Sequence, residues 1–149
     1  MKIYLGADHR GFELKQKIKK WLKEWKIDYE DMGNIKLDPV DDFTDYAEKV
    51  SQKVQEGLGE GILVCGSGSM AMVANKFKGI RAALVWNKAT AEHVKDHHNA
   101  NILSLPANFI KPEEVKEIIK IWLETKFLKE ERLIRRIDKI KQIEERNFI

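Results

Sequence analysis

The chain has 149 residues, of which 43% are hydrophobic and 34% are charged, with a formal net charge of +3. This length predicts a single domain over residues 1–149, and the apolar content excludes an intrinsically disordered protein. No apolar run approaches the roughly 20 residues that a membrane-spanning helix needs. Because the N-terminus has no hydrophobic signal core and the single cysteine cannot form an internal disulfide, we expect a cytoplasmic protein without a membrane partner.

Apolar strands and amphipathic helices alternate along the chain. Continuous apolar strands that alternate with helices are typical of a parallel sheet covered on both faces. The sequence therefore predicts an α/β, Rossmann-like fold with three layers around a five-stranded parallel sheet. The strands are expected over 2–8, 27–32, 61–65, 80–86 and 101–105, and the helices over 11–25, 45–56, 70–77, 88–98 and from 112 onward.

The last segment, 128–149, is predicted to form one more helix. It holds seven Lys/Arg and five Asp/Glu, a difference of two within a chain whose net charge is +3. Arg132 and Arg136 are four residues apart and share a helix face. This face is either a solvated basic surface or a phosphate clamp that reaches a partner subunit. Nucleic acid is a less favoured partner, because no dispersed basic patch or stacking aromatic motif accompanies these charges.

Ligands of such sheets bind outside the carboxyl ends of the strands. This rule selects residues 8–11, residues 65–69 and the pair Trp86 and Asn87. A lone cysteine at a strand end is commonly an inert core residue, but Cys65 runs directly into a Gly-Ser-Gly-Ser loop. Backbone N–H groups of that loop, together with the start of the next helix, would hold an oxyanion and favour a thiolate. A thiol beside an oxyanion site suits proton removal next to a carbonyl, where an enediolate must be stabilised.

Other phosphate-loop chemistries do not fit this loop. A cysteine phosphatase needs an arginine about six residues beyond the thiol, and Ala71 stands there. The Gly-Lys-Ser/Thr of a Walker loop and the third glycine of a dinucleotide fingerprint are both absent from this sequence.

The histidines suggest a shared site. His93 and His97 have a spacing that suits zinc, but no third ligand at a metal spacing is evident, so we expect no metal. His97 precedes the strand at 101–105 and should lie at the opposite sheet edge from Cys65 of its own chain. A helix-end histidine can simply pair with the helix dipole. If His97 is catalytic, it acts in a partner's site, which predicts a homodimer.

Several motifs recur in an order that resembles the type B ribose-5-phosphate isomerase family, which also includes galactose-6-phosphate isomerase subunits. The resemblance covers nearly the whole chain, and the combination is specific although each motif alone is not. The motifs are GADHRGF at 6–12, DYA at 45–47, GILVCGSG at 61–68, ANK at 74–76, GIRA at 79–82, HHNAN at 97–101 and RLIRRI at 132–137.

The resemblance implies a cofactor-free aldose–ketose isomerase, a dimer or tetramer whose sites are shared between chains. The favoured substrate is ribose 5-phosphate, converted to ribulose 5-phosphate. The resemblance implies that Cys65 is the base, that the Ser67 hydroxyl assists it, and that the loop of Gly66, Gly68 and Ser69 holds the enediolate. Asp8 and His97 would open the sugar ring. The phosphate would be bound by His9, Arg132 and Arg136, and His98 would lie beside the substrate.

The sequence departs from the family pattern at several positions. The loop between Cys65 and Met72 is one residue shorter. Phe43 stands where the family has tyrosine, and His98 where it has asparagine. Asn108 stands in place of an arginine, and Leu133 in place of a histidine. The alternative hypothesis is therefore a family member that is catalytically impaired, or that binds another sugar phosphate such as a hexose 6-phosphate.

Overall fold

The computed structural model describes residues 1–148, over which strands and helices alternate. The strands are β1 (Lys2–Ala7), β2 (Tyr29–Asp31), β3 (Gly59–Cys65), β4 (Ala82–Leu84) and β5 (Ile102–Pro106). The helices are α1 (Phe12–Glu24), α2 (Phe43–Gln55), α3 (Met70–Ala74), α4 (Lys88–Asp96), α5 (Pro112–Glu124) and α6 (Glu131–Asn147).

All strand pairs are parallel, and the five strands lie in the order β2-β1-β3-β5-β4. This confirms the predicted α/β, Rossmann-like fold. The chain leaves β1 toward β2 on one side and returns to β3 on the other side. The carboxyl ends of β1 and β3 therefore form the switch point at which such sheets bind ligands.

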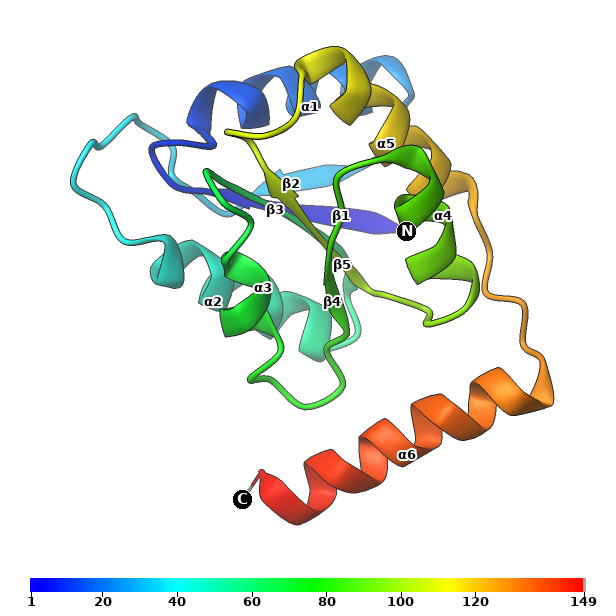
Figure 1. The fold of residues 1–149 in the computed structure, drawn as a ribbon. Coiled ribbons are helices and arrows are strands. Elements are labelled where there is room, and N and C mark those ends of the chain that lie inside the picture. The colour runs from blue at the N-terminus through cyan, green and yellow to red at the C-terminus, as the bar shows by residue number, and fades with distance from the viewer. Residues whose placement is uncertain (149) are drawn as a thin grey trace.

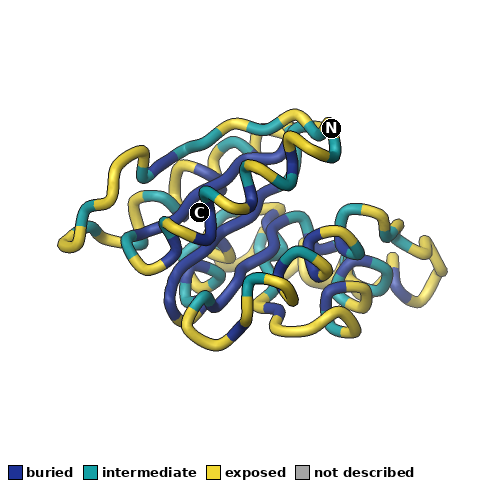
Figure 2. Tube along the Cα trace, turned by 90° about the horizontal axis from the view of Figure 1, so that it is seen from above, coloured by how far each residue is buried: buried dark blue, intermediate teal, exposed yellow. Residues whose placement is uncertain are grey.

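Helices cover both faces of the sheet, as Figure 1 shows. On one face, Ile18 of α1 and Trp122 of α5 are fully buried in a core that includes Ile62 and Leu103. On the other face, Ala47 of α2 and Met70 of α3 pack in a second core with Leu63. Figure 2 shows burial concentrated along the strands and the inward faces of the helices. The continuous apolar strands are thus buried from both sides, as their sequence predicts.

Helix α6 lies apart from the sheet, beyond an extended segment (Figure 1). Leu133 is fully buried, and the Gly79 N–H donates a hydrogen bond to Glu144 Oε2 at 3.0 Å. The predicted tail helix is confirmed over Glu131–Asn147, whereas 128–130 precede it and residue 149 lies outside the described residues. Its contact with a partner subunit stays a prediction.

Several elements are shorter than the sequence predicts, including β2, α3 and β4. The helix expected over 70–77 ends at Ala74, because the Asn75 side chain turns to pair with the backbone of Ala82. Asn75 Nδ2 donates to the Ala82 carbonyl at 2.9 Å, and the Ala82 N–H donates to Asn75 Oδ1 at 2.8 Å. The strand expected over 80–86 is confined to the edge strand β4. Within residues 1–148, no helix combines the length and apolar character required to span a membrane.

Candidate functional site

A cavity of about 310 Å³ opens at the carboxyl ends of β1 and β3. It brings together residues from two of the three segments that the strand-end rule selects. Its lining consists of Asp8, His9, Arg10, Asp41, Asp42, Phe43, Cys65, Gly66, Ser67, Ser69 and Asn108.

The Cys65 side chain lines this cavity. Cys65 ends β3 with 3% of its surface exposed, and its Sγ accepts a hydrogen bond from the Gly68 N–H at 3.2 Å. Gly68 has φ +80°, and a Cβ there would come within 2.2 Å of Leu84 Cδ1. The Ser104 hydroxyl donates to the Gly68 carbonyl at 2.8 Å and fixes the turn. The backbone N–H directed at the sulfur fixes the Cys65 side chain against the loop.

The rest of the loop differs in one respect from its predicted role. Helix α3, which follows the loop, has only five residues, so the dipole expected to support an oxyanion is small. The hydroxyls of Ser67 and Ser69 contact each other at the mouth of the cavity. A Cβ at Gly66 would come within 2.7 Å of both Arg10 Cδ and Asn108 Nδ2, so these two side chains lie directly over the loop.

Asp8 lies beside the thiol with 6% of its surface exposed. Its Oδ1 accepts hydrogen bonds from the N–H groups of Arg10 at 3.0 Å and Gly11 at 3.1 Å. Helix α1 has Gly11 as its N-cap without a side-chain cap bond, so Asp8 holds the turn before the helix and does not cap it. Its second oxygen, Oδ2, remains available to a ligand.

Asp41 is a site residue that the sequence analysis did not single out. The ring Nδ1 of His9 lies 2.7 Å from Asp41 Oδ1, and the His9 N–H donates to the same oxygen at 3.1 Å. Burial alone would raise the pKa of Asp41, but the hydrogen bonds from His9 and Asn34 outweigh it and hold the pKa below its usual value. Asp41 is therefore a carboxylate that orients the His9 ring and its backbone. The strand-end rule does not select it, because Asp41 lies at the far end of the loop between β2 and α2.

The predicted site residues His97 and His98 lie in a second group, at the end of α4. The His93 and His97 rings stack with centroids 4.1 Å apart, and the His98 ring lies 5.3 Å from that of His93. The pKa of His98 is lowered by burial first, and then by the positive charges of His93, His97 and Arg136. Arg132 pairs with Glu130, with Nη2 3.0 Å from Oε2.

These two groups lie at opposite edges of the sheet. The second group immediately precedes β5, whose amino end it therefore adjoins, whereas Cys65 ends β3. Because β3 and β5 are parallel, His97 is separated from the thiol by the length of the sheet. One chain thus carries both sets of predicted residues without joining them.

The third selected segment is not part of the cavity at Cys65. Trp86 and Asn87 line a different hollow, between the start of α4 and α5. Asn87 Oδ1 accepts the Thr90 N–H at 2.8 Å, so this side chain serves as the N-cap of α4.

The structure also places three of the residues that depart from the family pattern. Phe43 and Asn108 line the cavity, and Leu133 is buried within its own chain.

Comparisons with known proteins agree on one family. The model of the Ribose/Galactose Isomerase family matches residues 3–140. A probable ribose-5-phosphate isomerase B of Mycoplasma pneumoniae is 42% identical, over 84% of each chain. A putative sugar phosphate isomerase of Bacillus subtilis is 40% identical, over 99% of this chain and 100% of its own. Ribose-5-phosphate isomerase B of Mycoplasma genitalium, solved with bound ribulose-5-phosphate, superposes with a TM-score of 0.93 at 38% identity and covers 97% of this chain and 96% of its own.

Proposed function

Because the chain belongs to the ribose/galactose isomerase family, we propose that it interconverts ribose 5-phosphate and ribulose 5-phosphate through an enediolate. As a member of this family it is an aldose–ketose isomerase. The observation that supports this substrate and mechanism best is the buried Cys65 thiol, which lines a cavity of about 310 Å³ and accepts a backbone N–H at its sulfur.

The chemistry moves one proton between two carbons of the sugar and one between two oxygens. The Cys65 thiolate removes the proton from C2 of the open-chain aldose, and the electrons move toward the C1 carbonyl to give the enediolate. The Cys65 thiol, whose proton can exchange with solvent before transfer, then delivers a proton to C1, while a hydroxyl proton passes from O2 to O1. The hydroxyl of Ser67 and the loop of Gly66, Gly68 and Ser69 would stabilise the negative oxygen.

Two further tasks are opening the sugar ring and holding the phosphate. Asp8, with a free carboxylate oxygen in the cavity, would open the ring together with His97 of a second chain. His9 would bind the phosphate from within the cavity, and Arg132 and Arg136 would reach it from the second chain. His98 would contact the sugar beside them. The location of these groups at opposite edges of one sheet supports a homodimer with shared sites.

The alternative substrate is a hexose 6-phosphate. Phe43 places a ring without a hydroxyl in the cavity, and Asn108 contributes a neutral amide over the loop. Both change the hydrogen bonds available to the sugar and its phosphate, and neither touches the Cys65–Gly68 contact.

An NMR assay of C2-proton exchange in deuterated water tests this function. Wild-type protein is incubated with five- and six-carbon aldose phosphates, and we expect exchange and isomerisation with ribose 5-phosphate. The Cys65→Ala variant should lose several kcal/mol of transition-state stabilisation, more than about 1,000-fold in kcat/KM. Its melting temperature and oligomeric state should match the wild type, since the truncation removes one sulfur at a cavity wall. Retained activity in Cys65→Ala would contradict the proposed base, and exchange with hexose 6-phosphates alone would select the alternative substrate.

A further inference from the structure

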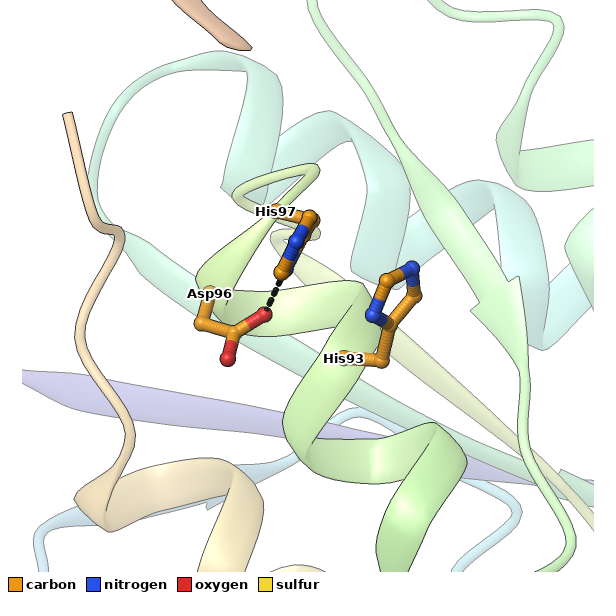
Figure 3. A group of neighbouring side chains, drawn as sticks. All are labelled: His93, Asp96 and His97. Atoms are coloured by element: carbon orange, nitrogen blue, oxygen red, sulfur yellow. Dashed lines mark hydrogen bonds and ion pairs between the residues drawn. The ribbon is translucent and has the colours of Figure 1, made fainter. Parts of the chain in front are cut away.

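The last turn of α4 carries a cluster of metal-ligating side chains outside the Cys65 cavity. His93, Asp96 and His97 stand at positions i, i+3 and i+4, which places them on one face of the helix. Each offers one ligand atom, and these atoms all lie within 4.8 Å of one another. Figure 3 shows the two imidazoles and the carboxylate gathered on the same side of the helix end.

Two imidazoles and a carboxylate form a ligand set that zinc accepts. Zn²⁺ bonds such groups at about 2.0–2.2 Å, so the ligand atoms of a tetrahedral site lie roughly 3.3 Å apart. His93 is exposed and the other two side chains are half-buried, so the required approach takes side-chain rotation without movement of the core. Asp96 Oδ1 already contacts His97 Nδ1, and a cation can replace the proton that they share.

The charges around the cluster limit its affinity without preventing binding. Asp96 supplies one negative charge, and both imidazoles bind metal in their neutral form. Arg136 lies near His98, and its positive charge opposes a cation. We therefore expect a site of moderate strength, which fills and empties with the free zinc concentration.

The other His-carboxylate group of the chain is a weaker candidate. Asp8, His9 and Asp41 also bring ligand atoms together. Asp8 already accepts two backbone N–H groups, and Asp41 accepts N–H groups from His9 and Asn34. These carboxylates accept hydrogen bonds from backbone and amide donors of the chain itself, whereas the Asp96 carboxylate contacts the His97 ring.

We propose that His93, Asp96 and His97 bind one Zn²⁺ ion per chain, with a fourth position left to water, and that the bound ion blocks His97. The blocking effect rests on the proposed function, in which His97 transfers a proton during ring opening. A metal bound to its imidazole removes it from that task, so zinc would inhibit the isomerase reversibly.

The binding test uses Zn²⁺ alone as the probe. Calorimetric titration is carried out on the full-length Cys65→Ala variant, which lacks the thiol as a competing zinc ligand. We expect one ion per chain, loss of at least tenfold in affinity on adding His93→Gln, and no change on adding Glu92→Gln. Glu92 is exposed on the same helix and is not a member of the cluster, so it controls for charge and helix stability. Absence of binding, or binding that His93→Gln leaves intact, would overturn the site.

The inhibition test uses the wild-type protein and the His93→Gln variant. Without metal the two should isomerise ribose 5-phosphate equally, because His93 has no role in the proposed reaction. Zn²⁺ should inhibit the wild type with reversal by a chelator, and inhibition of His93→Gln should need at least tenfold more zinc. Equal zinc sensitivity of both proteins would overturn the blocking effect. Failure of the isomerase proposal would appear separately, as no turnover in the metal-free wild type, and would leave the calorimetric result decisive for the site.

Discussion

Gly68 determines the geometry at the thiol. Its positive φ and its closeness to Leu84 leave no room for a side chain, and its N–H is the donor on Cys65 Sγ. In Gly68→Ala we expect a loss of about 1–3 kcal/mol in stability, and about a 100-fold fall in kcat as the donor moves. Thermal melts and steady-state kinetics measure the two effects. Gly57→Ala is the control, because Gly57 has φ +78° in open space and should lose stability without losing kcat.

The Asp41–His9 pair gives a second prediction for a single residue. Asp41→Asn replaces the carboxylate that orients the His9 ring, and we expect the KM for ribose 5-phosphate to rise about tenfold with little change in kcat. Steady-state kinetics at several pH values would measure the split. Asp42→Asn removes the same charge from the same cavity, with no hydrogen bond to His9 identified in the structure. An equal rise in KM for both variants would show that net charge, and not the pairing, acts on the phosphate.

At the level of secondary-structure elements, α1 and β2 are joined by a buried ion pair. Lys15 Nζ lies 2.7 Å from Asp31 Oδ1, and Lys19 Nζ lies 2.9 Å from Asp31 Oδ2. Burial would raise the pKa of Asp31, but hydrogen bonds from both lysines and from the Gly33 N–H outweigh it, so the pKa lies below its ordinary value of 3.8. The stabilisation is therefore present above that value and is lost as the pH falls through the lower, folded-state pKa.

Substituting Asp31 tests this link between the elements. Asp31→Asn leaves the Lys15 ammonium buried without its counter-charge, and we expect a loss of about 3–5 kcal/mol at neutral pH. Urea unfolding at neutral and acidic pH should also show a flatter pH dependence in the variant. A variant that loses stability in parallel with the wild type down to the most acidic pH would contradict the assigned role of Asp31.

Hydrophobic periodicity predicted the order of the elements because the central strands β1, β3 and β5 are largely buried and α1, α2 and α5 each bury one face. It did not predict the end of α3, which depends on a hydrogen bond between Asn75 and the backbone seven residues later. The candidate site also has residues that the sequence predicts and a pairing that it does not. Cys65 and Asp8 follow from the strand-end rule, whereas the pairing of His9 with Asp41 spans 32 residues and depends on the path of the β2–α2 loop. The spacing of His93 and His97 alone does not identify Asp96 as a third metal ligand.

At the scale of the whole molecule, the proposed catalytic groups of one chain do not meet. The Cys65 cavity adjoins the carboxyl edge of the sheet, and the α4 end with His97 adjoins the amino edge. Large apolar side chains are exposed on the carboxyl-edge segments, including Phe109 at 76% and Met72 at 72%. A two-fold dimer would cover such surfaces and would create two identical composite sites.

Complementation between two inactive variants tests this arrangement. Cys65→Ala homodimers lack the base in both sites, and His97→Asn homodimers lack the ring-opening group in both. When equal amounts are unfolded and refolded together, half of the dimers are mixed, and each mixed dimer has one intact and one doubly altered site. We therefore expect about one quarter of wild-type activity per chain, with light scattering reporting a dimer throughout. If each chain instead completed its own site, the mixture would be as inactive as its two components.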